Sequence, residues 1–178
     1  MIRIGIIVDM QNDFVSPNGA LSGADTQAVV PLVARYFHEH RDKLYALLDT
    51  HHADYLQTQE GKKLPVVHCI DGTWGHELNE HIQALPLDAQ LCKPTFGYVD
   101  WVRFLTQEGV LGAHAANELS FTLAGVDTDI CVITNALLLK SFFPEAEINV
   151  LQSLCSGTTP AAHDAALAVL QNCQINIR

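Results

Sequence analysis

A cysteine stands where a predicted buried strand gives way to a predicted helix. In the stretch AGVDTDICVITNAL (124–137), two aspartates and Cys131 lie between an apolar run (119–126) and an amphipathic segment (131–142). Unpaired backbone N–H groups at a helix start favour an anion, so a thiol there is expected to have a lowered pKa and to act as a nucleophile. Taken alone, a free cysteine is more often a small buried hydrophobe, and both interpretations stay open.

Two further residues could complete such chemistry. Asp9 closes the first predicted strand in IVDMQNDF, and a carboxylate can take a thiol proton and return it to a leaving amine. Lys93, in LCKPTFGYVD, would favour the charged forms of both acid and thiol if it lay between them. A turn-capping aspartate and an exposed surface lysine are the plain alternatives. The candidate catalytic group is therefore Asp9, Lys93 and Cys131.

Ionisable side chains also end other apolar runs. Asp49 and His51 end the second run, and His68 lies near the end of the third. In open α/β sheets, binding and catalytic sites form beyond the carboxyl ends of the parallel strands. Because polar groups follow one apolar run after another, we expect them to share one active site at that edge of the sheet.

The elements that must position these residues alternate between strand and helix. The apolar runs are continuous rather than alternating, which is typical of parallel strands covered on both faces. The pattern predicts an α/β fold with a doubly wound, mainly parallel sheet, as one domain over residues 1–178. Strands are predicted at 2–9, 43–51, 64–70, 119–126 and 147–153. Helices are predicted at about 25–40, 97–108, 131–142 and 160–172, the last with Thr159 as its cap and Pro160 at its first position.

Composition narrows the partners. The formal net charge is −10 and the ten Lys and Arg residues are scattered, so nucleic acid is not an expected partner. The apolar runs are far short of a membrane span, so no membrane association is expected. The five cysteines form no CxxC pair, which predicts free thiols and a cytoplasmic location. The absence of GxGxxG, P-loop and GxSxG motifs argues against dinucleotide, nucleoside triphosphate and serine hydrolase chemistry.

Three ordered motifs carry a resemblance. IVDMQNDF, KPTFGY and AGVDTDICVITNAL together resemble the isochorismatase-like cysteine hydrolases, a family that includes nicotinamidases. SGTTPAAHDAAL (156–167) is also similar to a late loop and helix of that family. The matching segments run from residue 4 to about residue 166, which is nearly the whole chain. The resemblance implies a six-stranded, Rossmann-like parallel sheet with helices on both faces.

The resemblance also implies roles for the motif residues. By motif position, Asp9, Lys93 and Cys131 form the family's Asp–Lys–Cys triad. A cis peptide bond is implied between Val126 and Asp127, and the backbone N–H groups of Asp127 and Cys131 are implied as the oxyanion hole. Many family members carry a small residue where this chain has Asp127, so its carboxyl is expected to narrow or recharge the pocket.

A metal site is implied within the nicotinamidase-like branch. Its members carry Asp-x-His at the end of the second strand and a histidine at the end of the third, and Asp49, His51 and His68 fit those positions. Imidazoles and a carboxylate suit Zn²⁺, with Mn²⁺ or Fe²⁺ as alternatives. Relatives supply a further ligand from the following loop, but here HADYLQTQEGKKLP shows no clear equivalent. His52 and Glu60 could serve only if the fold brought them close.

These observations favour a hydrolase that cleaves the C–N bond of a small carboxamide, nicotinamide included, through a cysteine thioester. Phe14 and, less strongly, Trp74 are candidate walls of its substrate pocket. A metal-free hydrolase of a carbamoyl or ureido compound is one alternative, and a thiol redox or binding protein without turnover is another. The expected partners are a small-molecule amide and further copies of the chain, as a dimer or tetramer.

Overall fold

A six-stranded, all-parallel sheet forms the centre of the fold. In the computed structural model, which describes residues 1–178, the strand order is β3-β2-β1-β4-β5-β6. The strands are β1 (Ile2–Val8), β2 (Lys43–Asp49), β3 (Ala89–Lys93), β4 (Leu119–Val126), β5 (Glu147–Ser156) and β6 (Asn176–Ile177). The order progresses outward from β1 to β3, then restarts on the other side of β1 with β4. The prediction of a doubly wound parallel sheet is therefore confirmed.

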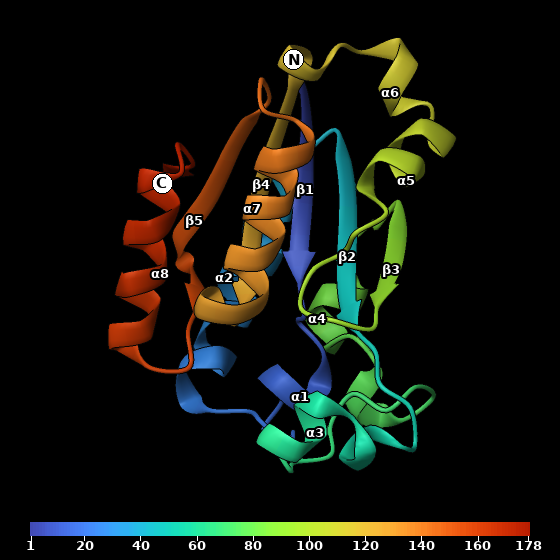
Figure 1. Cartoon of the computed structure of the whole chain (residues 1–178), viewed down its shortest axis with the longest axis vertical. Helices are drawn as coiled ribbons and strands as arrows, with labels where there is room; N and C mark the ends of the chain where they lie inside the picture. Colours follow the sequence, from blue (N-terminus) through green and yellow to red (C-terminus); the bar gives the residue numbers. More distant parts are fainter.

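Helices cover both faces of this sheet. Helix α2 (Ala24–Glu39) lies behind it in Figure 1, whereas α7 (Ile133–Phe142) lies in front of β4 and α8 (Pro160–Asn172) lies beside β5 at the left. Helix α5 (Trp101–Gln107) packs beside α7. None of the helices combines the length and apolar character that crossing a membrane requires. The short elements are α1 (Asn12–Val15), η1 (Tyr55–Gln57), α3 (Gln59–Lys63), η2 (Trp74–His76), α4 (Glu80–Gln83), the kinked α6 (Val110–Ala113), η3 (Ala116–Glu118) and the π-helical turn η4 (Thr128–Val132).

Three features of the predicted secondary structure are wrong. The run 64–70 is not a strand but a connecting segment, in which only Ile70 forms a bridge, with His51. The actual third strand is β3, which the sequence pattern missed because it is a short edge strand with an alternating burial pattern. The two-residue β6, at the opposite edge, was also missed.

The best predicted helix is α8. It spans Pro160–Asn172 as expected, and the Thr159 hydroxyl caps it by accepting a hydrogen bond from the Ala162 N–H. The helix expected from residue 131 begins instead at Ile133, after η4. Cys131 therefore lies in the π-helical turn that precedes the regular helix.

The register of the central strands decides which side chains can meet. Val8, the last residue of β1, is opposite Leu47 of β2 on one side and Gly125 of β4 on the other. Asp9 consequently emerges between the ends of β2 and β4. Asp49 and Lys93 are opposite each other at the ends of β2 and β3. The carboxyl ends of four neighbouring strands thus open onto one region.

Gly125 allows β4 to lie close against β1 at this edge. Its φ is +128°, and a Cβ at this position would lie 2.1 Å from the Val8 carbonyl oxygen. A side chain there would force apart the strand ends that carry Asp9 and η4.

Replacing Gly125 with alanine is therefore expected to lower the free energy of unfolding by about 2 kcal/mol or more, through backbone strain and the contact with Val8. Gly109→Ala is the matched control, because Gly109 has a φ of +71° but open space around its Cβ position. That control should cost only the conformational term, about 1 kcal/mol. Urea unfolding of both variants measures the difference, and equal losses would show that the close approach is unimportant.

Candidate active site

Asp9, Lys93 and Cys131 meet at the carboxyl edge of the sheet. The Lys93 Nζ lies 2.8 Å from Asp9 Oδ2 and 3.6 Å from Cys131 Sγ. The three residues are separated by many positions in the sequence and arrive from β1, β3 and η4. They are 1%, 1% and 6% exposed, respectively. We call them the Asp–Lys–Cys cluster.

Burial and neighbouring charges together set the ionisation of Asp9 and Lys93. Burial raises the pKa of Asp9 to about 6, against the lowering effect of Lys93. Asp9 forms an ion pair with Lys93, but neither of its carboxylate oxygens accepts a hydrogen bond from the protein. Burial would lower the pKa of Lys93, but Asp9, Cys131 and Asp49 together raise it well above its usual value. Lys93 is therefore a permanent cation beside a carboxylate with free acceptor capacity.

The Cys131 thiol differs from its sequence-based expectation. Burial, followed by the negative charge of Asp9, raises the pKa of Cys131 well above its usual value, and Lys93 opposes this only in part. The expectation of a lowered pKa is thus wrong, because desolvation of the thiolate outweighs the field of the turn. The sulfur is a thiol at neutral pH, so any nucleophilic role requires a base to remove its proton.

Hydrogen bonds hold η4 and the loop after β3 in place. Asn135 of α7 donates to the carbonyl groups of Cys131 (2.8 Å) and Phe96 (3.0 Å), and its own oxygen accepts the Tyr98 N–H. The Asp129 carboxylate accepts from the backbone and hydroxyl of Thr158 at 2.8 and 2.6 Å. These two bonds tie η4 to the segment that follows β5.

The backbone at the start of η4 also agrees with expectation. The peptide bond between Val126 and Asp127 is cis. The Asp127 N–H donates to no acceptor within the chain, so it is available to a ligand. This availability is compatible with the oxyanion-hole role that the family resemblance implies for this N–H group.

A second cluster of ligand-type side chains adjoins the first. Asp49, His51, Glu60 and His68 each place one oxygen or nitrogen atom within 4.8 Å of all the others. The His51 Nε2 lies 2.9 Å from Asp49 Oδ2 and 3.5 Å from Glu60 Oε1, and the His68 Nε2 lies 3.4 Å from Asp49 Oδ2. We call these four residues the metal-candidate cluster.

Backbone contacts orient this cluster. The Gln11 side chain both donates to the Asp49 carbonyl and accepts the Asp49 N–H, each at 2.8 Å. The Asp13 carboxylate accepts the Cys69 N–H at 2.7 Å, which anchors the segment that carries His68. His68 Nδ1 lies 2.8 Å from the Val66 carbonyl, which favours the tautomer whose Nε2 faces the cluster as a free ligand atom.

Sequence reasoning left the fourth member of the cluster open. Glu60 lies in the first turn of α3, a short helix that Thr58 caps through the Gly61 N–H. That cap was the one sequence signal for a helix in this loop, and the helix turns Glu60 towards the histidines. His52, the other candidate, is exposed and outside the cluster.

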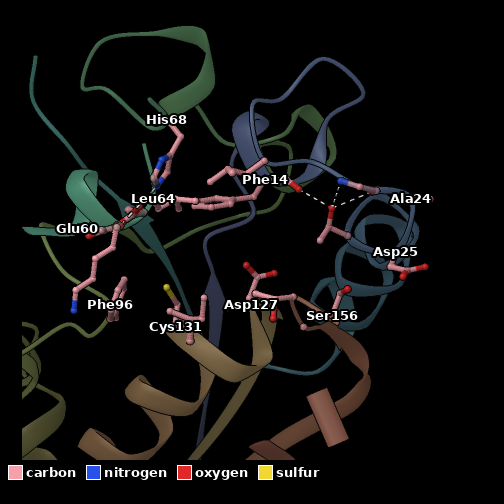
Figure 2. Close-up of a pocket in the computed structure, with 18 residues that line it drawn as sticks. Phe14, Ala24, Asp25, Glu60, Leu64, His68, Phe96, Asp127, Cys131 and Ser156 are labelled. Carbon is pink, nitrogen blue, oxygen red and sulfur yellow. Dashed lines mark hydrogen bonds and ion pairs between the residues drawn. The ribbon is translucent and has the colours of Figure 1, made fainter. Parts of the chain in front are cut away.

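A cavity of 590 Å³ opens above both clusters. Figure 2 shows Cys131 and Asp127 on one side of it, with Phe14 and His68 opposite. Phe14 lines the cavity, and its ring meets that of His68 edge-on, with 5.5 Å between the ring centroids. Trp74 does not line it, and its side chain is half exposed on η2.

The fold and these clusters agree with a family comparison. The model of the isochorismatase domain matches residues 4–177. The chain belongs to the isochorismatase family. It is accordingly a hydrolase of that family, built on the fold that the sequence motifs implied.

Individual relatives are distant but cover the whole chain. A nicotinamidase from Schizosaccharomyces pombe is 25% identical over 204 residues, which covers 97% of this chain and 90% of the yeast protein. A pyrazinamidase of Pyrococcus horikoshii, solved in complex with zinc, matches with a TM-score of 0.75 and 23% identity, over 100% of this chain and 99% of its own. A protein from L. infantum, solved in complex with nicotinate, matches with a TM-score of 0.83 and 20% identity. The match covers 99% of this chain and 92% of that protein. At these identities the solved structures establish the shared fold.

The donor set of this isochorismatase-family chain fits a divalent metal. Two imidazoles and two carboxylates are the ligands that Zn²⁺, Mn²⁺ and Fe²⁺ accept. The buried Nε2 atom of His51 makes no hydrogen bond, although it points into the cluster. A buried imidazole nitrogen without a hydrogen bond is what a ligand-binding role would leave behind.

We therefore expect the protein to bind about one Zn²⁺ per chain, as a three- or four-ligand site does. Glu60→Ala should weaken zinc binding by about 10-fold or more, and His51→Ala by more still, because each removes a ligand atom. His52→Ala is the control and should bind zinc as wild type does. Titration against a competing chelator, with elemental analysis, gives the affinities. If Glu60→Ala and His52→Ala behave alike, Glu60 is not a ligand.

Proposed function

We propose that the chain is a cysteine amidohydrolase that cleaves the C–N bond of a small carboxamide, in the manner of a nicotinamidase. The observation that carries this proposal is the meeting of Asp9, Lys93 and Cys131, of which Cys131 lines the cavity. The nicotinamidase and pyrazinamidase relatives support an amide as the substrate, with nicotinamide as one candidate. The whole chain acts as one cysteine hydrolase domain.

In the first half-reaction, Asp9 takes the proton of the Cys131 thiol and the sulfur attacks the carboxamide carbon. The new S–C bond pushes an electron pair onto the carbonyl oxygen. The backbone N–H groups of Asp127 and Cys131 donate to that oxyanion. Lys93, 3.6 Å from the sulfur, stabilises the thiolate while it exists.

Collapse of this intermediate breaks the C–N bond. Asp9 returns the proton to the departing nitrogen, so ammonia leaves and a thioester remains on Cys131. Asp9, again a carboxylate, then takes a proton from water as the water attacks the thioester carbon. The C–S bond breaks and the carboxylic acid is released, and Asp9 returns its proton to the sulfur, which restores the thiol and the Asp9 carboxylate.

Asp49, His51, Glu60 and His68 are the residues that would hold a metal ion. When bound there, the ion would supply Lewis acidity towards a water or a polar group of the substrate. Three members of this cluster, Asp49, Glu60 and His68, line the cavity. They would therefore lie close to a substrate bound there. Because Glu60 provides a fourth potential ligand, the site favours a metal-dependent hydrolase over a metal-free hydrolase of carbamoyl or ureido compounds.

The first test of this proposal is ammonia release from a panel of small amides that includes nicotinamide. Cys131→Ala should lose about 10³-fold or more in kcat/KM on every amide that wild type cleaves, because the thioester cannot form. Cys92→Ala is the matched control, since Cys92 is a free, exposed cysteine. Equal rates in wild type and Cys131→Ala would remove the proposed function.

The pH profile provides a separate test. Asp9 must be ionised to accept the thiol proton, and burial raises its pKa to about 6. Amidase kcat/KM is therefore expected to fall as the pH drops through about 6, rather than near the usual range of an exposed aspartate. The measurement is kcat/KM across acidic to neutral pH with a neutral amide. A profile that stays flat well below that value would rule out Asp9 as the base.

A further inference from the structure

One carboxyl group in the cavity has no part in the steps above. The Asp127 side chain lines the cavity beside Cys131, and Figure 2 shows its carboxyl group directed into the space between Cys131 and Phe14. No hydrogen-bond donor or cation of the protein serves this carboxyl, and only the like charges of Asp129 and Asp9 act on it. It differs in this respect from Asp129, which Thr158 satisfies.

The surroundings of Asp127 make a positively charged or N–H-bearing ligand favourable. Apolar side chains form much of the cavity wall, among them Phe14, Phe96 and Ile130. Burial, with smaller contributions from Asp129 and Asp9, raises the pKa of Asp127 to about 7. A carboxylate held in such a place gains stability from a donor or a cation that a ligand brings to it.

The charged residues that share the cavity do not meet this demand. Asp49 and Glu60 belong to the metal-candidate cluster, and Asp25 is an exposed acid in the first turn of α2 whose carboxyl points away from the cavity in Figure 2. The cation of the lining is Lys63, an exposed residue at the end of α3 that forms no ion pair with Asp127. Lys93 is already engaged with Asp9 and Asp49.

We propose that the Asp127 carboxyl selects the substrate, and that the preferred amides carry an amine or another N–H donor within a few bonds of the scissile carbonyl. The position of the residue supports this short separation. Its backbone N–H faces the proposed oxyanion, so its side chain can reach only the first few atoms of the acyl group. This inference rests on the proposed amidase function and specifies its substrate class.

Matched amides test the inference. 3-Aminopropanamide and butanamide are nearly equal in shape and differ by an ammonium group in place of a methyl group, and succinamate puts a carboxylate there. 2-Aminobenzamide and 2-methylbenzamide make the same comparison on a flat ring. Wild type should prefer the amino member of each pair in kcat/KM by about 10-fold or more, the effect of a charge-assisted hydrogen bond, and should disfavour succinamate.

Variants assign this preference to the carboxyl group. In Asp127→Asn and Asp127→Ala, the ratio of kcat/KM within each pair should fall towards one, whatever happens to the rate itself. Asp25→Asn removes the carboxyl group of another lining residue, one that points away from the cavity, and should keep the wild-type ratio. With 3-aminopropanamide, the wild-type ratio should rise as the pH rises through about 7 and Asp127 ionises, while the Asp127→Asn ratio stays level. The ratio cancels the ionisation of Asp9, which acts on both amides of a pair.

The outcomes separate this inference from the function on which it rests. If wild type cleaves amides, nicotinamide included, but does not prefer the amino members, the inference is wrong and the amidase proposal stands. The same holds if the preference survives unchanged in both Asp127 variants. If wild type and Cys131→Ala are equally inactive on every amide, the amidase proposal fails and the inference falls with it.

Discussion

A buried lysine is the constraint around which the carboxyl edge of the sheet is organised. Removing an ammonium group from water costs several kcal/mol, so a lysine that is 1% exposed requires carboxylates beside it. Asp9 and Asp49 provide them at 2.8 and 3.4 Å, from the ends of β1 and β2. Lys93 itself ends β3. One charge therefore ties three neighbouring strand ends together, and the Cys131 sulfur is added to the same point by η4.

Asp49 links this arrangement to the metal-candidate cluster. One of its oxygens contacts Lys93, and the other lies 2.9 Å from His51 and 3.4 Å from His68. Positive charge held among the histidines would reduce the pull of Asp49 on Lys93 and leave that cation more fully to Asp9 and the thiol. The two clusters are thus electrostatically coupled through a single carboxylate, although they adjoin different parts of the cavity.

Asp127 presents two groups of opposite character at the start of η4, and the proposals above give each of them a role. Its backbone N–H is free to bind an oxyanion, while its carboxyl group faces the cavity without a partner. An anion-binding amide and a carboxylate on the same residue would oppose each other if both acted on one atom. They can act together only if the substrate presents a carbonyl oxygen to the first and a donor to the second, which is the physical basis for the proposed substrate class.

Local patterns in the sequence were sufficient to locate strands that are buried on both faces and helices that are stabilised by neighbouring residues in the chain. The continuous apolar runs located β1 and β4, and the Thr159 cap with Pro160 located α8, because these signals do not depend on distant residues. The family motifs also singled out Asp9, Lys93 and Cys131, although the strand that carries Lys93 was not predicted. Tertiary structure decided the rest. The segment 64–70 is apolar enough for a strand, but it crosses the carboxyl edge instead, and the edge strand β3 exists through its pairing with β2. Glu60 joins the histidines because α3 turns it inward, and burial reverses the pKa shift expected for Cys131. Ligand geometry and desolvation depend on which distant residues surround a group, and the order of residues along the chain does not contain that information in any local pattern.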